Sequence, residues 1–178
     1  MVILKVLGYA VAIIVLLAAS AFATGMMLPK AHTAVVRVHI GKAPQAVYDA
    51  ITDVARAPAW RSGLKKVEVL SQPNEPLQWR ETAGYGTMTY AMDLASPPSR
   101  VATRIVDTEQ GFAGGWTFEI TPEGNGSSLL ITENGEVYNP LFRFMSKFVF
   151  GQYRALETYA QDLGRHFNES VQPQRVQR

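Results

Sequence analysis

Hydrophobic and polar positions alternate along most of this chain, but its opening stretch is wholly apolar. Residues 6–28 contain no charged side chain, and Pro29 and Lys30 follow them directly. At about 1.5 Å of rise per residue, such a helix covers roughly 34 Å, whereas the hydrocarbon core of a bilayer is about 30 Å thick. The pattern therefore predicts a transmembrane helix over residues 6–28, behind a short tail of residues 1–5.

Two other interpretations of the apolar stretch stay open. Lys5 and the Ala21-Phe22-Ala23 run resemble the basic start and the cleavage site of a secretory signal. A helix buried in a soluble domain is the other interpretation. The apolar run continues through Leu28, however, and the apolar cores of signal peptides are shorter, so a retained anchor fits the length best.

The side of the membrane is encoded weakly. Lys5 lies before the apolar stretch, and Lys30, Arg37 and Lys42 follow it, so the positive-inside rule does not decide the orientation. A short tail ahead of a first apolar segment suits a signal anchor. We therefore expect a single-pass membrane protein whose C-terminal domain is extracytoplasmic.

Beyond residue 28 the polarity pattern predicts strands. Residues 34–40 place Ala34, Val36 and Val38 on one face and Arg37 and His39 on the other. Six further segments have strand-like patterns and are separated by turn residues: residues 65–71, 77–83, 87–95, 100–107, 115–121 and 128–138. Because no helix lies between these six, they predict an antiparallel meander.

Helical spacing appears at two places in this part of the chain. Pro44 suits the first position of a helix over residues 44–53, which a short turn over residues 54–57 follows. A long amphipathic helix is predicted from Pro140 to about Phe167, with a kink or close backbone approach at Gly151. The polar tail, residues 168–178, contains Pro173 and is expected to be disordered. The elements predict an α+β domain in which the last helix covers a curved sheet.

The amino-acid composition excludes several classes of binding site and reaction. The 17 Lys and Arg residues nearly balance the 15 Asp and Glu residues, so there is no electrostatic signal for nucleic acid. The chain has no cysteine, which excludes disulfides and thiolate chemistry. Its three histidines stand apart and no phosphate loop or dinucleotide motif occurs, so we expect neither a metal site nor a cofactor.

Three stretches carry a family resemblance: residues 40–48 (Ile-Gly-Lys-Ala-Pro-Gln-Ala-Val-Tyr), Pro58-Ala59-Trp60, and residues 131–141 at the expected last strand and helix start. With this order of elements, residues 33–167 resemble the START-like helix-grip superfamily, or SRPBCC, and most closely its polyketide cyclase/dehydrase and lipid-transport group. The resemblance implies a curved seven-stranded antiparallel sheet wrapped around a long C-terminal helix, with an elongated apolar cavity. The superfamily includes lipid carriers, ligand sensors, polyketide cyclases and coenzyme Q chaperones, so the fold does not choose between these activities.

Strand alternation gives a set of residues that would line such a cavity. On residues 87–95, Met88, Tyr90, Met92 and Leu94 share one face, and methionine and aromatic side chains suit an adaptable apolar pocket. A plain packed core is the alternative at each position. The expected ligand-binding residues are Trp79, Met88, Tyr90, Met92, Trp116, Phe118, Glu133, Phe144 and Phe148.

Glu133 is the polar residue of most interest, because it shares a predicted face with Leu129 and Ile131. A carboxyl group there would orient a ligand or act as an acid with a raised pKa. If the alternation slips near Gly135, Glu133 is exposed instead. Glu81 and Arg80 are adjacent, so only one of the two side chains can face inward.

Three functions remain open at this point. The leading one is a membrane-anchored module that binds a lipid or another hydrophobic small molecule and that is not an enzyme. The second is an enzyme of the cyclase/dehydrase type, for which Glu133 and Tyr90 are the candidate acid or base groups. The third is a structural or interaction domain with a fully packed interior.

Overall fold

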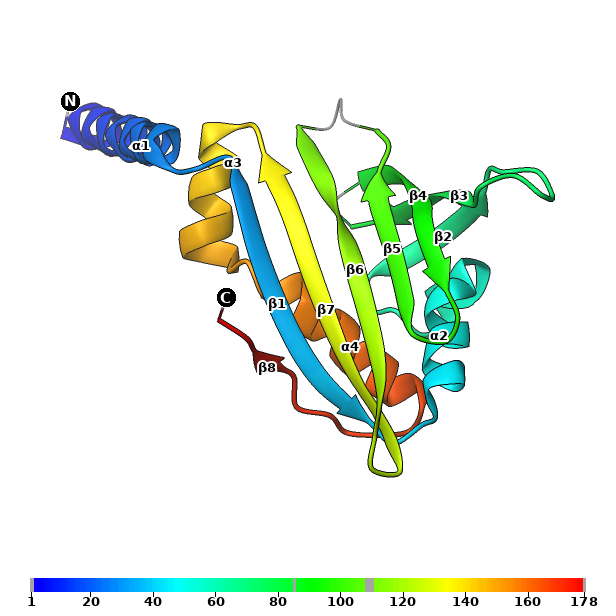
Figure 1. The fold of residues 1–178 in the computed structure, drawn as a ribbon. Helices are drawn as coiled ribbons and strands as arrows, with labels where there is room; N and C mark the ends of the chain where they lie inside the picture. The colour runs from blue at the N-terminus through cyan, green and yellow to red at the C-terminus, as the bar shows by residue number, and fades with distance from the viewer. Residues whose placement is uncertain (1, 85, 108–110, 178) are drawn as a thin grey trace.

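One antiparallel sheet forms most of the domain and curves around the C-terminal helix (Figure 1). The computed structural model describes residues 2–84, 86–107 and 111–177. Within them the strand order is β2-β3-β4-β5-β6-β7-β1-β8, so eight strands replace the seven expected. The strands are β1 (Ala31–Ile40), β2 (Leu64–Val69), β3 (Gln78–Ala83), β4 (Gly86–Ser96), β5 (Arg100–Ile105), β6 (Phe112–Glu123), β7 (Gly126–Val137) and β8 (Gln174–Arg175).

The additional strand comes from the C-terminal tail, for which the sequence predicts disorder. In the structure β8 pairs with β1, with Val36 opposite Arg175 and Arg37 opposite Gln174. The Arg175 side chain also donates to Glu157, over 2.6 Å from Nε to Oε1. These contacts hold the tail along the outer edge of β1, so the expectation of disorder differs from the structure.

The helices lie at the two ends of the sheet and across its concave face. They are α1 (Val2–Met27), α2 (Pro44–Thr52), the 3-10 helix η1 (Val54–Ala59), α3 (Pro140–Met145), the π-helical turn η2 (Ser146–Phe150) and α4 (Arg154–His166). Pro44 opens α2 and Pro140 opens α3, where a missing backbone N–H costs nothing.

The helix predicted from residue 140 to 167 is interrupted at Gly151, the position where the sequence predicts a kink, and forms separate segments instead of one continuous helix. This glycine has φ 79° and ψ 134°, a combination that residues with a Cβ rarely adopt. The backbone therefore changes direction between η2 and α4. Only α4 packs across the sheet, while α3 and η2 lie at its edge beside β1 (Figure 1).

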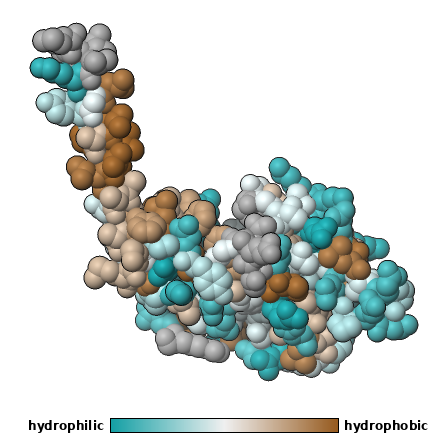
Figure 2. Space-filling model, turned by 90° about the horizontal axis from the view of Figure 1, so that it is seen from above, coloured by the Kyte–Doolittle hydropathy of each residue, from teal (hydrophilic) through white to brown (hydrophobic). Residues whose placement is uncertain are grey.

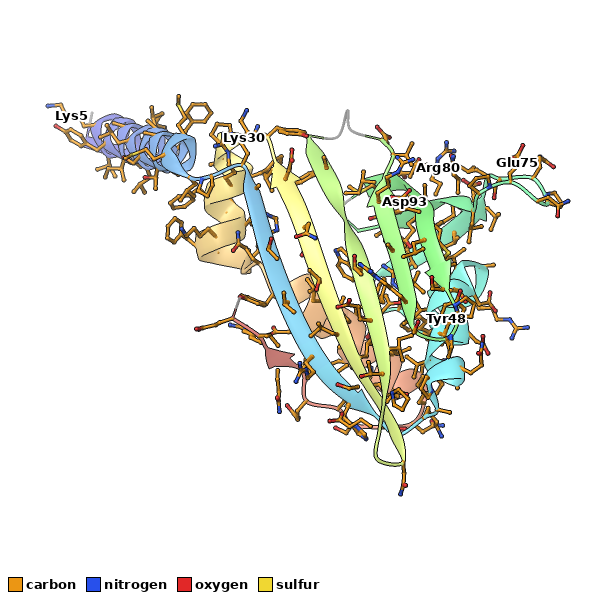
Figure 3. The ribbon with its side chains drawn as sticks, in the orientation of Figure 1. Lys5, Lys30, Tyr48, Glu75, Arg80 and Asp93 are labelled. Atoms are coloured by element: carbon orange, nitrogen blue, oxygen red, sulfur yellow. The ribbon has the colours of Figure 1, made fainter. Side chains whose placement is uncertain are left out.

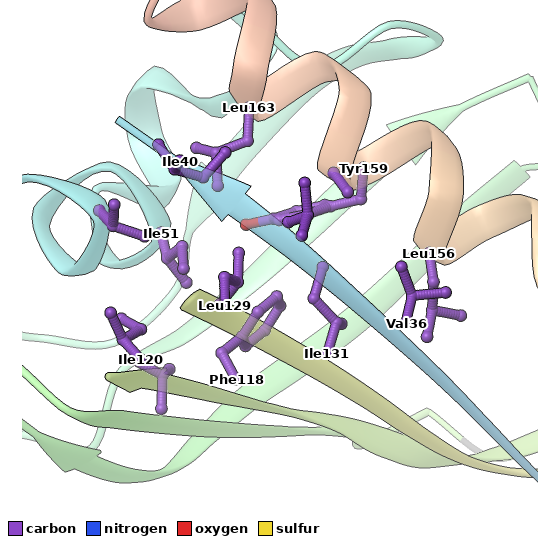
Figure 4. Packing of buried hydrophobic residues seen from close by; sticks show 14 of the residues in the cluster. Val36, Ile40, Ile51, Phe118, Ile120, Leu129, Ile131, Leu156, Tyr159 and Leu163 are labelled. Atoms are coloured by element: carbon purple, nitrogen blue, oxygen red, sulfur yellow. The ribbon is translucent and has the colours of Figure 1, made fainter. Parts of the chain in front are cut away.

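The core lies between α4, α2 and the central strands (Figure 4). Leu156 and Leu163 of α4 are fully buried among side chains of β1, β6 and β7. Val36, Val38 and Ile40 face this core, as the alternation of β1 predicts.

α1 stands apart from the core. It is long and apolar enough to cross a membrane from Lys5 to Met27, and the most apolar part of it is entirely unburied. Figure 2 shows it as a largely hydrophobic rod projecting from a mostly polar domain, and Figure 3 shows Lys5 at its far end and Lys30 where it joins the domain. Its last turns meet α3, where a Cβ on Gly25 would lie 1.9 Å from the Pro140 carbonyl oxygen.

Candidate functional site

A cavity of about 560 Å³ lies between the concave face of the sheet and α4. Strands β3 to β7 form one wall, η1 and the loop that follows it close one end, and η2 and Gly151 border the other. Its lining is mainly apolar, with a few charged groups among aromatic and methionine side chains. A volume of this size suits a small organic ligand.

Most of the predicted ligand-binding residues meet in this cavity. The two exceptions are Phe144 and Phe148, whose rings lie 5.1 Å apart and contact each other outside it. They lie outside because the break at Gly151 turns α3 and η2 away from the axis of α4. The residues that do line the cavity are Trp79, Met88, Tyr90, Met92, Trp116, Phe118 and Glu133.

Regular strand pairing explains why these side chains converge. Met92 lies opposite Thr103, and Thr103 lies opposite Trp116, so all three face the same side of the sheet. The register shifts between Met92 and Leu94. Leu94, predicted to face inward, is consequently exposed, because a bulge reverses the alternation beyond it.

Glu133 stays on the inner face, because β7 keeps a continuous register with β1 and β6 through Gly135. Its carboxyl group lies 4.0 Å from His32 Nε2 and is hydrogen-bonded to the Trp116 side chain. Burial raises the pKa of Glu133 to about 7, and the Trp116 bond opposes part of that shift. Burial also lowers the pKa of His32. Near neutral pH the cavity thus holds a carboxyl group poised between its acid and base forms.

A second charged group lies on the opposite side of the cavity. Glu81, not Arg80, faces inward, and the residue is 3% exposed. Arg61 Nη1 donates to Glu81 Oε1 over 2.6 Å, and Trp79 Nε1 donates to the same oxygen over 3.0 Å. The carboxylate is therefore held by two donors, one of them cationic.

Aromatic rings of β6 and of Trp60, directly after η1, meet at Tyr159 of α4. The rings of Trp60, Trp116 and Phe118 lie 5.3–5.5 Å from the Tyr159 ring, and the Arg61 guanidinium lies 5.3 Å from it. Burial raises the pKa of the Tyr159 hydroxyl, so the group stays protonated. This cluster gives the cavity a flat aromatic wall, which suits an apolar or planar ligand.

Three residues of this site were not singled out from the sequence: Arg61, Tyr159 and His32. The inward direction of Glu81 was predictable from the sequence, because Glu81 is two residues from Trp79 on the same strand and their side chains therefore share one face. Arg61 offers no comparable signal, because it follows a 3-10 helix and its direction depends on tertiary packing. Within the described residues, no three His, Asp or Glu side chains come together as a metal site.

Comparison with known families gives one match across most of the chain. Residues 31–163 match the model of the polyketide cyclase / dehydrase and lipid transport family. No curated protein matches the chain.

Solved structures share the fold at low sequence identity. A START superfamily protein from Mycobacterium smegmatis is 17% identical with a TM-score of 0.62, and the match covers 78% of this chain and 97% of that one. The Zhui aromatase/cyclase from Streptomyces sp. R1128 is 16% identical with a TM-score of 0.63, covering 78% and 94%. Norcoclaurine synthase from Thalictrum flavum is 10% identical with a TM-score of 0.61, covering 76% and 93%. These likenesses confirm the predicted α+β helix-grip fold.

Proposed function

Since the chain belongs to the polyketide cyclase/dehydrase and lipid transport family, we propose that it is a membrane-anchored module that binds a lipid or another hydrophobic small molecule. The observation that carries this proposal is the apolar cavity of about 560 Å³. A fully packed interior, the structural alternative, would leave no such volume.

The chemistry of the lining suggests what the ligand contains. Aromatic and methionine side chains favour an apolar body, and Glu133 offers a hydrogen-bonding group within that surface. When protonated, Glu133 donates to a carbonyl or hydroxyl oxygen; when ionised, it accepts from a hydroxyl. A largely apolar molecule with one oxygen-bearing head fits both parts of the cavity.

The proposed membrane anchor places this cavity where apolar molecules partition. α1 ends at Met27 and β1 begins at Ala31, so the domain follows the anchor almost directly. Packing of Gly25 on Pro140 supports retention of α1 rather than its removal as a signal. We propose that the domain lies on the extracytoplasmic side.

Native mass spectrometry of the full chain, released from detergent micelles, tests the proposal. We expect a reproducible copurifying lipid, which organic extraction then identifies. Thr103→Trp, which adds a large ring to the cavity wall, should abolish retention, whereas Ala95→Trp at an exposed position of β4 should not. An empty wild-type chain that takes up no added lipid would overturn the proposal.

A second candidate function is catalysis of the cyclase/dehydrase type, and Glu133 is the specific observation that favours it. A carboxyl group with a pKa of about 7 exchanges protons readily at neutral pH. Tyr90 is less suited, because its hydroxyl is directed to Met88 Sδ over 3.2 Å. If Glu133→Gln leaves any measured turnover unchanged while ligand is still retained, Glu133 is not the acid or base.

A further inference from the structure

The segment of α3 and η2, residues 140–150, exposes an unusual amount of apolar surface. Leu141, Phe142, Phe148, Val149 and Phe150 are between 40% and 57% exposed. Half of the large hydrophobic residues that the structure shows as exposed outside α1 lie in this one segment. A contiguous apolar surface of this kind marks a site of contact with a membrane or another molecule.

Contacts with α1 place this apolar surface beside the end of the proposed membrane anchor. Pro140 packs against Gly25, and Arg143 Nη1 donates over 2.7 Å to the Leu28 carbonyl oxygen just beyond α1. Figure 1 shows that α3 runs across the direction of α1 where α1 meets the domain. α3 therefore lies directly beside the end of α1, where the chain would leave a bilayer that α1 crosses.

The charges of the segment match a lipid surface. The chain has no acidic residue between Glu136 and Glu157, while Arg143, Lys147 and Arg154 lie in this interval. Lys147 is exposed, and its Nζ lies 5.8 Å from the Phe148 ring. Basic groups beside exposed aromatic rings suit the boundary between headgroups and acyl chains, particularly of anionic lipids.

The same segment borders the cavity. Ser146, Phe150 and Gly151 are part of the lining, and Phe150 and Gly151 are also exposed. Phe142, on the exposed side, lies 5.6 Å ring to ring from Phe112, which lines the cavity. The apolar surface is thus continuous with the end of the cavity closest to α1.

We propose that residues 140–150 lie in the interfacial layer of the bilayer that holds α1, and that the ligand enters the cavity from that bilayer between η2 and β6. This inference rests on the proposed function: the contact with lipid depends on the membrane anchor, and the entry route depends on the bound ligand. Lipid, rather than a protein partner, is the occupant that the contact with α1 and the basic charges favour.

The absence of native cysteine makes the contact directly measurable. Phe148→Cys and Val149→Cys, each labelled with an environment-sensitive fluorophore in the full chain, are placed in phosphatidylcholine–phosphatidylglycerol vesicles. Lipids spin-labelled in the upper acyl chain should quench both positions several-fold more than Val69→Cys, an exposed apolar residue on the distant strand β2. Equal quenching at all three positions would overturn the proposal.

A kinetic experiment tests the entry route. Phe148→Asp combined with Val149→Asp should slow the transfer of a pyrene-labelled fatty acid from vesicles into the cavity several-fold, and Val69→Asp should not. Retention of that fatty acid loaded in detergent should stay the same in all variants, since neither residue lines the cavity. Unchanged transfer would refute the route, whereas absence of retention in the wild type would refute the proposed function instead.

Discussion

At the scale of single residues, Glu133 contributes a pH dependence to the stability of the domain. Burial raises its pKa from 4.5 to about 7, so the folded chain binds more protons than the unfolded chain between these values. Its contribution to stability is full below about pH 4.5 and is lost as pH rises through about 7, a change of up to about 3 kcal/mol.

Glu133→Gln should remove this dependence. In thermal unfolding of the full chain in detergent, the Tm of the wild type should fall relative to that of the variant as pH rises from about 4.5 to about 7.5. The lowered pKa of His32 contributes the opposite slope, but both chains contain that residue. Glu75→Gln, in an exposed turn, is the control. A constant Tm difference would contradict the buried environment of Glu133.

The Arg61–Glu81 pair yields a second prediction at this scale. Arg61→Met leaves a Glu81 side chain that is 4% exposed without its cationic donor, which should cost about 3 kcal/mol of unfolding free energy. Adding Glu81→Gln should recover part of that loss, because the uncompensated charge is gone. Chemical denaturation of the three chains measures this coupling. Strictly additive effects would show that the pair does not act as a unit.

At the scale of elements, Gly151 separates two helices that would otherwise continue. No atom lies within 4 Å of a Cβ built on it, so Gly151→Ala introduces backbone strain without a clash. We expect a loss of about 1–3 kcal/mol, measured by denaturant unfolding. Gly84→Ala, also free of neighbours but without a positive φ, should have a much smaller effect. Similar losses at both positions would argue against the strained conformation.

Packing of α1 on α3 can be tested in the same way. Gly25→Val should force the helices apart, because even a Cβ would overlap the Pro140 carbonyl. Spin labels on Leu17→Cys and Thr121→Cys should then show a broader distance distribution by pulsed electron resonance. Gly8→Val, where a Cβ has no neighbour within 4 Å, is the matched control. An unaltered distribution in Gly25→Val would contradict the contact.

Elements also show what the sequence could predict. Period-two alternation was sufficient for β1, β6 and β7, whose ladders are regular, and it brought Trp116, Phe118 and Glu133 to one cavity. It failed at Leu94, where a bulge alters the register, because the bulge depends on the neighbouring strand. The sequence marked a kink at Gly151 but not the separation into α3, η2 and α4, because a periodic pattern does not encode how far the backbone changes direction. The sequence of the tail does not predict β8, because this short strand forms only by pairing with the open edge of β1.

At the scale of the whole molecule, topology is the remaining prediction. The full chain should resist alkaline extraction from membranes, and its intact mass should include residues 1–23, since we propose that α1 is retained. A reporter fused after Arg178 should be active outside the cytoplasm. Activity of the fusion confined to the cytoplasm would reverse the orientation, and a mature chain that begins after Ala23 would replace the anchor with a cleaved signal.

The short connection between Met27 and Ala31 has a consequence for kinetics in the proposed anchored state. A domain without a flexible tether diffuses only along the membrane surface. Its rate of encounter with ligand therefore depends on the mole fraction of that ligand in the bilayer. Total ligand concentration in the surrounding solution would matter little. Expanding the membrane at a fixed amount of protein and ligand should therefore slow loading, as dilution does for reactants in solution.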